Sequence, residues 1–318
     1  MKSLVVTAGK FLLFIFLMMS IGTTNARSFM RFDDKALEGR WDITMTMNGK
    51  QVPSWLEVRH SGVKTLVGDF VGVSGSARPI AKIKSDNGRY TFSIPPQWEN
   101  GPQDFMFDFT LQGDRLSGTM TDADGKSHTW TGVRAPSLRR SAPVTWAQPI
   151  SLFNGKDLTG WHTEGENQWK VNNGLLVNPK SGSNLITDQK FKDFKLHVEF
   201  RLPAGSNSGI YLRGRYELQI AYSEGMDPLK DQMGAIYGFI APSEMVAKGP
   251  GEWQMYDVTL TGRMITVVAN GKMIICNQEI PGITGGAMDS NEGEPGPLLI
   301  QGDHGAVEFR NIVITPAK

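Results

Sequence analysis

Residues 194–202 read Phe-Lys-Leu-His-Val-Glu-Phe-Arg-Leu, with an apolar side chain at every second position. Side chains of an extended strand point alternately to its two faces, so this run predicts a strand with one face in a core and the other in solvent. Residues 41–47, Trp-Asp-Ile-Thr-Met-Thr-Met, alternate in the same way far upstream. The two runs together predict an all-β protein.

Turn residues between such runs support this fold class. Asn270-Gly271 lies between the apolar runs 265–268 and 273–275, and this pair is preferred in two-residue hairpin turns. Gln112-Gly113-Asp114 joins two further runs in the same manner. After the N-terminal segment, no apolar pattern of helical period continues for a convincing length, so we expect antiparallel strands connected by tight turns.

The strand pattern stops between residues 135 and 149. This stretch carries Pro136, Pro143 and Pro149 together with Arg139-Arg140, a composition typical of a linker. It divides the chain into a first domain at residues 28–134 and a second domain at residues 150–318.

The first domain is predicted to be a small antiparallel β-barrel. Gly39-Arg40-Trp41 resembles the opening of lipocalin-like barrels, whose interior holds a ligand or is filled by side chains. Trp55, Trp98 and Trp130 could line a sugar site, although packing in the core is the favoured interpretation. The segment contains no acid pair, metal cluster or phosphate-binding loop, which leaves accessory binding, docking and spacing as open roles.

The beginning of the chain has the features of an export signal at residues 1–26. Lys2 and Lys10 precede the apolar run 11–21, and small residues stand at positions 24 and 26 before the expected cleavage. The run is shorter than the ~20 residues that a spanning helix needs, so a cleaved signal is favoured over a retained anchor. We therefore expect a secreted or periplasmic protein that does not associate with a membrane after cleavage.

Cysteine content and charge restrict the function classes further. Cys276 is the only cysteine, so no intramolecular disulfide can form, and its place after Met273-Ile274-Ile275 predicts a small buried side chain. The formal net charge of +1 indicates neither a nucleic-acid partner nor an anionic membrane surface.

A series of short phrases runs in order through residues 150–318. They are Leu152–Trp161, Asn207–Ile220, Gly234–Gly238, Gly249–Gln254, Gly296–Gln301, Asp303–Gly305 and Phe309–Ile312. In this order they resemble the 3-keto-disaccharide hydrolase family. The resemblance implies a concanavalin-A-like jelly-roll sandwich that acts on 3-keto-glycosides in secreted bacterial proteins.

The phrase Asn207–Ile220 also carries a strand argument of its own. Glu217 and Gln219 stand two positions apart and therefore share one face, which Arg215 joins if the strand begins there. Ordinary glycosidases use two carboxylates, and Gln219 occupies the place of the second acid. The strand thus argues against a conventional retaining glycosidase and fits a different chemistry.

The chemistry of a 3-keto-glycoside suggests which residues serve it. The carbonyl acidifies the hydrogen on C2, so a base can remove it, and the resulting enolate can expel the aglycone from C1 before water adds. We expect His304 or Glu217 as the base, and Arg213 or Arg215 as the group that stabilises the enolate oxygen.

Sugar contacts and cofactors complete this hypothesis. We expect Asn207, Gln219 and Gln301 to bind hydroxyls, and Tyr237 or Trp253 to stack on the ring. No metal-binding motif occurs, and no cofactor is firmly indicated. A divalent cation held by Glu217, Asp303 and His304 stays open as an alternative polariser.

Two other interpretations of the second domain compete with the elimination catalyst. One is a carbohydrate-binding jelly roll without catalysis, because the same fold serves lectins and enzymes. The other is a conventional endoglycosidase. The acid, arginine and histidine groups gathered in the quoted phrases favour an enzyme, since sugar-binding proteins rely mainly on aromatic and amide side chains.

Overall fold

The computed structural model describes residues 34–99 and 101–318 and builds them almost entirely from β-strands. The run that begins at Phe194 forms β14 (Phe194–Arg201), and every second residue of this strand is buried. The described residues include no α-helix, and their one helical element is the 3-10 turn η1 (Asp34–Leu37). The predicted all-β fold class is therefore confirmed.

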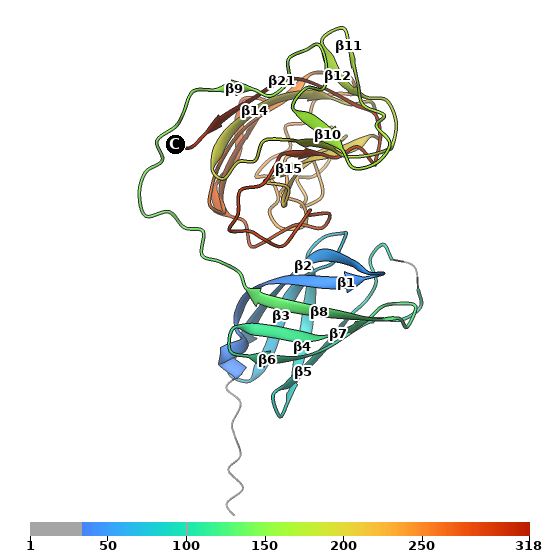
Figure 1. The fold of residues 1–318 in the computed structure, drawn as a ribbon, viewed down its shortest axis with the longest axis vertical. Coiled ribbons are helices and arrows are strands. Elements are labelled where there is room, and N and C mark those ends of the chain that lie inside the picture. Colours follow the sequence, from blue (N-terminus) through green and yellow to red (C-terminus); the bar gives the residue numbers. More distant parts are fainter. Residues whose placement is uncertain (1–33, 100) are drawn as a thin grey trace, which may run out of the picture. The chain divides into compact units, whose positions relative to one another are not determined.

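Eight antiparallel strands close into a barrel in chain order (Figure 1). They are β1 (Gly39–Met47), β2 (Lys50–Ser61), β3 (Thr65–Val71), β4 (Arg78–Asp86), β5 (Arg89–Ile94), β6 (Phe105–Gln112), β7 (Arg115–Thr121) and β8 (Ser127–Arg134). Pairing of Trp41 in β1 with Arg134 in β8 closes the ring. The rings of Phe92 and Phe107 stack at 4.4 Å within an apolar cluster that includes Trp130, so side chains fill the barrel.

The second half of the chain forms two packed sheets, the sandwich that the jelly-roll prediction required. The first sheet has the order β10 (Trp161–Thr163), β13 (Leu185–Thr187), β20 (Leu299–Ile300), β15 (Asn207–Leu212) and β16 (Tyr216–Ala221). The second has the order β11 (Lys170–Asn172), β12 (Leu175–Asn178), β21 (Val307–Pro316), β14, β17 (Gln254–Thr261), β18 (Met264–Ala269) and β19 (Lys272–Glu279), and β9 (Ile150–Ser151) pairs with β21.

One apolar cluster fills the space between the sheets and also takes in two barrel residues, Trp55 and Val71. Trp55 is fully buried and meets Phe239 edge to face at 5.3 Å. A Cβ at Gly282 would come within 2.1 Å of the Trp55 indole nitrogen, so only glycine leaves room for this ring. Barrel and sandwich accordingly belong to one compact unit.

The predicted linker carries no strand but makes specific contacts with the sandwich. Trp146 forms an isolated β-bridge with Ala317, and Arg140 donates to the buried carboxylate of Asp193 at 2.6 Å. The barrel strands end at Arg134 and the sandwich strands begin at Ile150. The domain boundaries proposed above remain a prediction.

The expected signal peptide at residues 1–26 lies outside the described residues. In the part of the chain that the structure describes, no helix has the length and apolar character needed to span a bilayer.

Cys276 corrects one expectation from the sequence, because its side chain is exposed instead of buried. The pairing of β18 with β19 shifts register near Val267, and Ile274 and Ile275 are both buried in succession. This irregularity uses two consecutive residues for the inner face, so the next residue turns outward. Period-two reasoning cannot locate such a bulge.

Candidate functional site

The hairpin of β15 and β16 presents a polar face, as its period-two pattern predicts. Tyr211 pairs directly with Glu217, and Gly209 pairs with Gln219 across the two strands. The intervening residues point into the sandwich core; they are Ile210, Leu212, Tyr216, Leu218 and Ile220. The core therefore holds the hairpin rigidly from one side and leaves the carboxyl of Glu217 on the other.

A cavity of about 550 Å³ lies against this polar face. Its lining residues are Ser74, Gly75, Trp98, Asn184, Asn207, Tyr211, Glu217, Gln219, Tyr237, Gly285, Gly286, Gln301, Asp303 and His304. Eight of the residues singled out from the sequence meet here: Trp98, Asn207, Glu217, Gln219, Tyr237, Gln301, Asp303 and His304. Residues far apart in the chain thus converge on one site.

Gly209 makes space for the Glu217 carboxyl. A Cβ at this position would lie 2.5 Å from Glu217 Oε1, closer than carbon and oxygen can approach. The hydroxyl of Tyr211 lies 2.9 Å from Glu217 Oε2 and 3.0 Å from the carbonyl oxygen of Gly285. A phenol has one proton to donate, so Tyr211 can satisfy only one of these two acceptors at a time.

Burial raises the pKa of Glu217 to about 8, and the charge of Asp303 adds to this rise. The hydrogen bond from Tyr211 and the positive charge of His304 act in the opposite direction. The side chain is 4% exposed and forms no ion pair among the described residues. At neutral pH Glu217 is therefore mainly a carboxylic acid, which can donate its proton to Tyr211 while Tyr211 donates to Gly285.

His304 and Asp303 form a pair at the rim of the cavity. Nδ1 of His304 lies 2.7 Å from Asp303 Oδ1, and the imidazole is about half exposed. The hydrogen bond to Asp303 is the main cause that raises the pKa of His304, and the Glu217 charge also contributes. Because Nδ1 is occupied, Nε2 is the ring nitrogen that can exchange a proton with a ligand.

Three carboxamide oxygens in the lining lack a hydrogen-bond partner among the described residues. They belong to Asn207, Gln219 and Gln301, and all three are buried. A buried acceptor without a donor is costly, and native proteins rarely tolerate several in one place. A ligand that carries several hydroxyl groups would supply the missing donors.

Loops close the cavity on its remaining sides. The backbone N–H of Tyr237 donates to the carbonyl of Glu217 at 3.0 Å, which fixes this ring at the edge of β16. Gly285 and Gly286 pack between Tyr211 and the barrel loop that carries Gly75, where a Cβ on either glycine would clash. The barrel thus contributes to the wall through Ser74, Gly75 and the 67% exposed Trp98.

The structure does not bring Arg213, Arg215 and Trp253 into this cavity. Arg215 lies in the turn before β16, so strand alternation does not apply to it, and it binds Asp289 at 2.7 Å. Arg213 occupies the same turn with a φ of 55° and donates to the Tyr216 hydroxyl.

Trp253 lies at a different place on the sandwich. Its ring is covered by the guanidinium groups of Arg310, at 4.0 Å, and Arg201, at 4.8 Å. These cation–π contacts occupy the ring, so the predicted stacking on a sugar has no support from its position.

Sequence reasoning missed several lining residues. Tyr211 shares the alternation of Asn207 and Gly209, and counting by two along β15 would have found it. Asn184 and Gly285 gave no comparable indication, because loop packing alone brings them to the cavity. For Trp98 the favoured interpretation of core packing was wrong, since it is 67% exposed and lines the cavity, whereas Trp55 and Trp130 are buried.

The sequence leaves open a divalent cation held by Glu217, Asp303 and His304, all of which line the cavity. Residues 34–99 and 101–318 contain no group of three or more His, Cys, Asp or Glu side chains arranged to hold a metal ion.

Comparison with known families places this site in context. Residues 148–315 match the family described as "3-keto-alpha-glucoside-1,2-lyase-like domain", and this span is more than half of the chain. The chain belongs to that family. Every lining residue of the cavity except the three barrel residues lies within the matched span of the lyase-like domain.

Individual relatives of this lyase-like domain match a shorter part of the chain or share a lower sequence identity. A 3-keto-disaccharide hydrolase of Bacteroides thetaiotaomicron is 31% identical over 82 residues, which are 22% of this chain and 28% of that protein. A candidate glycosyl hydrolase structure from Parabacteroides distasonis is 28% identical with a TM-score of 0.45, and covers 57% of this chain and 94% of its own. A second from the same organism has 25% identity and a TM-score of 0.42, with coverage of 53% and 98%. Together the family and the hydrolase relative support a carbohydrate-active hydrolase.

Proposed function

We propose that this protein cleaves 3-keto-glycosides in the cavity around Glu217, by removal of the C2 proton, elimination of the aglycone and addition of water. The family membership and the name of the Bacteroides relative supply the substrate class. The observation that carries the proposal is the set of unpartnered carboxamide oxygens beside a protonated carboxyl and an Asp–His pair.

Hydroxyl groups of the sugar would satisfy the carboxamides of Asn207, Gln219 and Gln301. Each sugar hydroxyl is a donor as well as an acceptor, so one ring can serve several of these groups at once. The remaining wall, with Tyr237 and Trp98, offers aromatic surface for the second ring or aglycone. This arrangement selects a polyhydroxylated ligand over an apolar or charged one.

In the proposed first step Nε2 of His304 accepts the C2 proton, while Asp303 holds the imidazole through Nδ1. The electron pair of the C2–H bond moves into a C2–C3 double bond, and the negative charge develops on the carbonyl oxygen. Glu217 in its acid form, together with Tyr211, would stabilise that oxygen. These residues take the place that Arg213 and Arg215 held in the sequence hypothesis.

In the second step the enolate reforms the carbonyl and expels the aglycone oxygen from C1, which takes up a proton from His304. The product is a conjugated 3-keto sugar with a C1–C2 double bond. Water then adds its oxygen to C1 and a proton to C2, so that the net reaction is hydrolysis. A single uncharged carboxyl beside Gln219 suits this route better than a double displacement, which needs two carboxylates.

Product analysis tests the proposal. Purified full-length protein is incubated in deuterated water with a 3-keto-disaccharide and, separately, with the corresponding ordinary disaccharide. We expect cleavage of the 3-keto substrate alone, and deuterium at C2 of the released 3-keto sugar. Cleavage of both substrates without label at C2 would contradict the proposal and favour a direct hydrolysis, whereas binding without turnover would favour a carbohydrate-binding module.

We also propose that the enzyme works outside the cytoplasm, on the basis of the export signal in residues 1–26. Expression of the full chain in a bacterial host, followed by fractionation and N-terminal sequencing, tests this. A mature N-terminus at Arg27 in the periplasm or medium is expected, and an unprocessed cytoplasmic protein would contradict it.

A further inference from the structure

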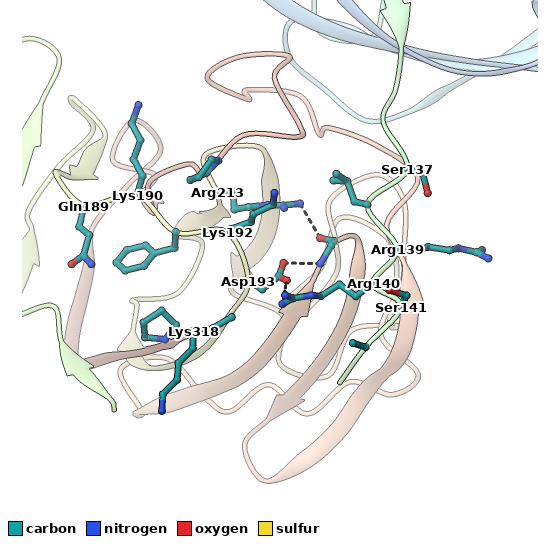
Figure 2. Close-up of a pocket in the computed structure, with 17 residues that line it drawn as sticks. Ser137, Arg139, Arg140, Ser141, Gln189, Lys190, Lys192, Asp193, Arg213 and Lys318 are labelled. Atoms are coloured by element: carbon teal, nitrogen blue, oxygen red, sulfur yellow. Dashed lines mark hydrogen bonds and ion pairs between the residues drawn. The ribbon is translucent and has the colours of Figure 1, made fainter. Parts of the chain in front are cut away.

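A second cavity, of about 600 Å³, lies on the sandwich away from the Glu217 site. The linker segment 137–142 forms one wall, and the remaining lining comes from residues 189–193, the buried Arg213, Gly262, Pro295 and residues 316–318. Figure 2 shows Arg213 and Asp193 between the segment with Ser137 and Ser141 on one side and Gln189 and Lys190 on the other. The two cavities share no lining residue.

Positive charge dominates the lining of this second cavity. Asp193 is its one acidic side chain, and it accepts hydrogen bonds from Arg140 at 2.6 Å and from the backbone of Gly262 at 2.8 Å. Arg139 binds Glu279 at 3.0 Å. Lys190, Lys192 and Lys318 form no ion pair with any described residue, and all three are exposed to solvent.

Arg213 brings to this cavity a charge that forms no ion pair with any described residue. Its side chain is completely buried, and Nη2 donates to the Tyr216 hydroxyl at 2.9 Å and the Gly262 carbonyl at 2.8 Å. Nε and Nη1 find no acceptor among the described residues. A guanidinium group keeps its charge in proteins, and a buried charge without a counter-ion is strongly unfavourable.

The backbone of Arg213 supports the same interpretation. Its φ of 55° lies in the left-handed region, which non-glycine residues seldom adopt. Such conformations persist where the surrounding structure enforces them, and they concentrate at ligand sites. Here the conformation places a guanidinium in the floor of a cavity whose rim carries Lys190, Lys192 and Lys318 without ion pairs.

We propose that this cavity binds a tetrahedral oxyanion, either free sulfate or phosphate or the same group as an ester on a carbohydrate. Lys190 and Lys192 contact the anion from the rim, and Arg213 provides the balancing positive charge below it. Because segment 137–142 forms one wall, the bound anion holds the linker against the sandwich. The site is independent of the proposed catalytic function.

Anion binding to the full-length protein tests the proposal. Titration calorimetry and thermal unfolding are recorded with sodium sulfate, sodium phosphate and glucose 6-phosphate, and with sodium chloride at equal ionic strength. The variant K190Q/K192Q removes two of the three lysine charges at the rim, and K170Q/K180Q removes two exposed lysines of the sandwich outside the cavity as a matched control.

We expect the Kd of the oxyanion to rise at least tenfold in K190Q/K192Q and to stay within twofold of wild type in K170Q/K180Q. Tight binding of glucose 6-phosphate with weak binding of the free ions would identify the ester as the source, and the reverse would identify the free ion. An equal response of all three proteins would overturn the proposal, because sulfate and phosphate also stabilise proteins through exclusion from their surface. Absence of binding in wild type would overturn it as well.

Discussion

Glu217 and Glu292 are both buried carboxyls, 4% and 0% exposed, yet their surroundings push them to opposite protonation states. Glu292 accepts hydrogen bonds from Arg263 Nε at 3.0 Å and from the Tyr216 hydroxyl at 2.7 Å. Burial opposes its ionisation, but the Arg263 guanidinium outweighs this and lowers the pKa of Glu292. Among the described residues the Glu217 carboxyl has one side-chain hydrogen bond, from the Tyr211 hydroxyl, and no ion pair, so burial raises its pKa to about 8.

This difference in ion pairing distinguishes a buried acid that stabilises the fold from one that can exchange a proton with a ligand. A buried carboxylate that is paired with a guanidinium holds parts of the fold together. Here Asp42 of β1 completes the group: burial and the nearby Glu292 charge raise the pKa of Asp42, whose proton then bridges to Glu292. A buried carboxyl that forms no ion pair, in the lining of a cavity, keeps a proton that it can give to a ligand.

The largest expected effect is on stability and concerns Glu292. Replacement of Glu292 by Gln leaves the buried Arg263 without its counter-ion, and breaking such a pair costs about 3–5 kcal/mol. Denaturant unfolding at pH 7 measures the loss. Glu217→Gln is the matched control and should keep wild-type stability or exceed it. Equal losses of unfolding free energy in the two variants would show that the two carboxyls do not differ in their contribution to stability.

The pH dependence of stability tests the raised pKa of Glu217 separately from Glu292. The folded pKa of Glu217 lies well above its unfolded value of 4.5, so the folded state binds the extra proton between about pH 4.5 and 8. Stability from this group is fully present below pH 4.5 and is lost as the pH rises through 8, at up to ~1.4 kcal/mol per unit. The wild type should lose stability relative to Glu217→Gln over this range. Parallel stability curves would contradict the raised pKa.

Replacement of His304 tests whether the cavity beside Glu217 carries out the proposed proton removal. His304→Ala removes the proposed base and should lower kcat on a 3-keto-disaccharide by about 10²-fold, the usual value of a positioned acid or base. KM should change little because the carboxamides remain. His162 forms a similar pair with Asp188 outside the cavity, at 2.6 Å, so His162→Ala is the control and should keep wild-type kcat. Comparable rates in the two variants would exclude His304 as the base.

The smallest expected effect concerns the wall that the barrel supplies. Trp98→Ala removes exposed aromatic surface from the cavity and should raise KM by roughly three- to tenfold, in line with ~0.5–1.5 kcal/mol for an aromatic contact. Trp253→Ala, outside the cavity, serves as the control. An unchanged KM for Trp98→Ala would mean that the barrel does not contact the substrate.

The sequence predicted those parts of the molecule that repeat with a fixed period. Alternation at residues 194–202 located β14, and the spacing of Glu217 and Gln219 assigned both to one face of β16. The same rule failed for Arg215, because the residue lies in a turn that precedes the strand. It also failed for Cys276, where a bulge interrupts the alternation.

Contacts between loops that are far apart in the chain leave no periodic pattern in the sequence. Trp98 reaches the cavity only because the barrel packs on the sandwich through Trp55, and no local period records that packing. The charge state of Glu217 was equally hidden, since it depends on which cations the fold places nearby. Residue type alone could not distinguish Glu217 from Glu292.

Infrared difference spectroscopy of the buried carboxyls tests this account most directly. Wild type and Glu217→Gln are compared from pH 5 to pH 9, so that the protonated Asp42, present in both, cancels. The account predicts a protonated-carboxyl band in the wild type at pH 6 that is missing from Glu217→Gln and disappears as the pH passes about 8. An ionised Glu217 at pH 6, with identical spectra for the two proteins in the acid region, would contradict it.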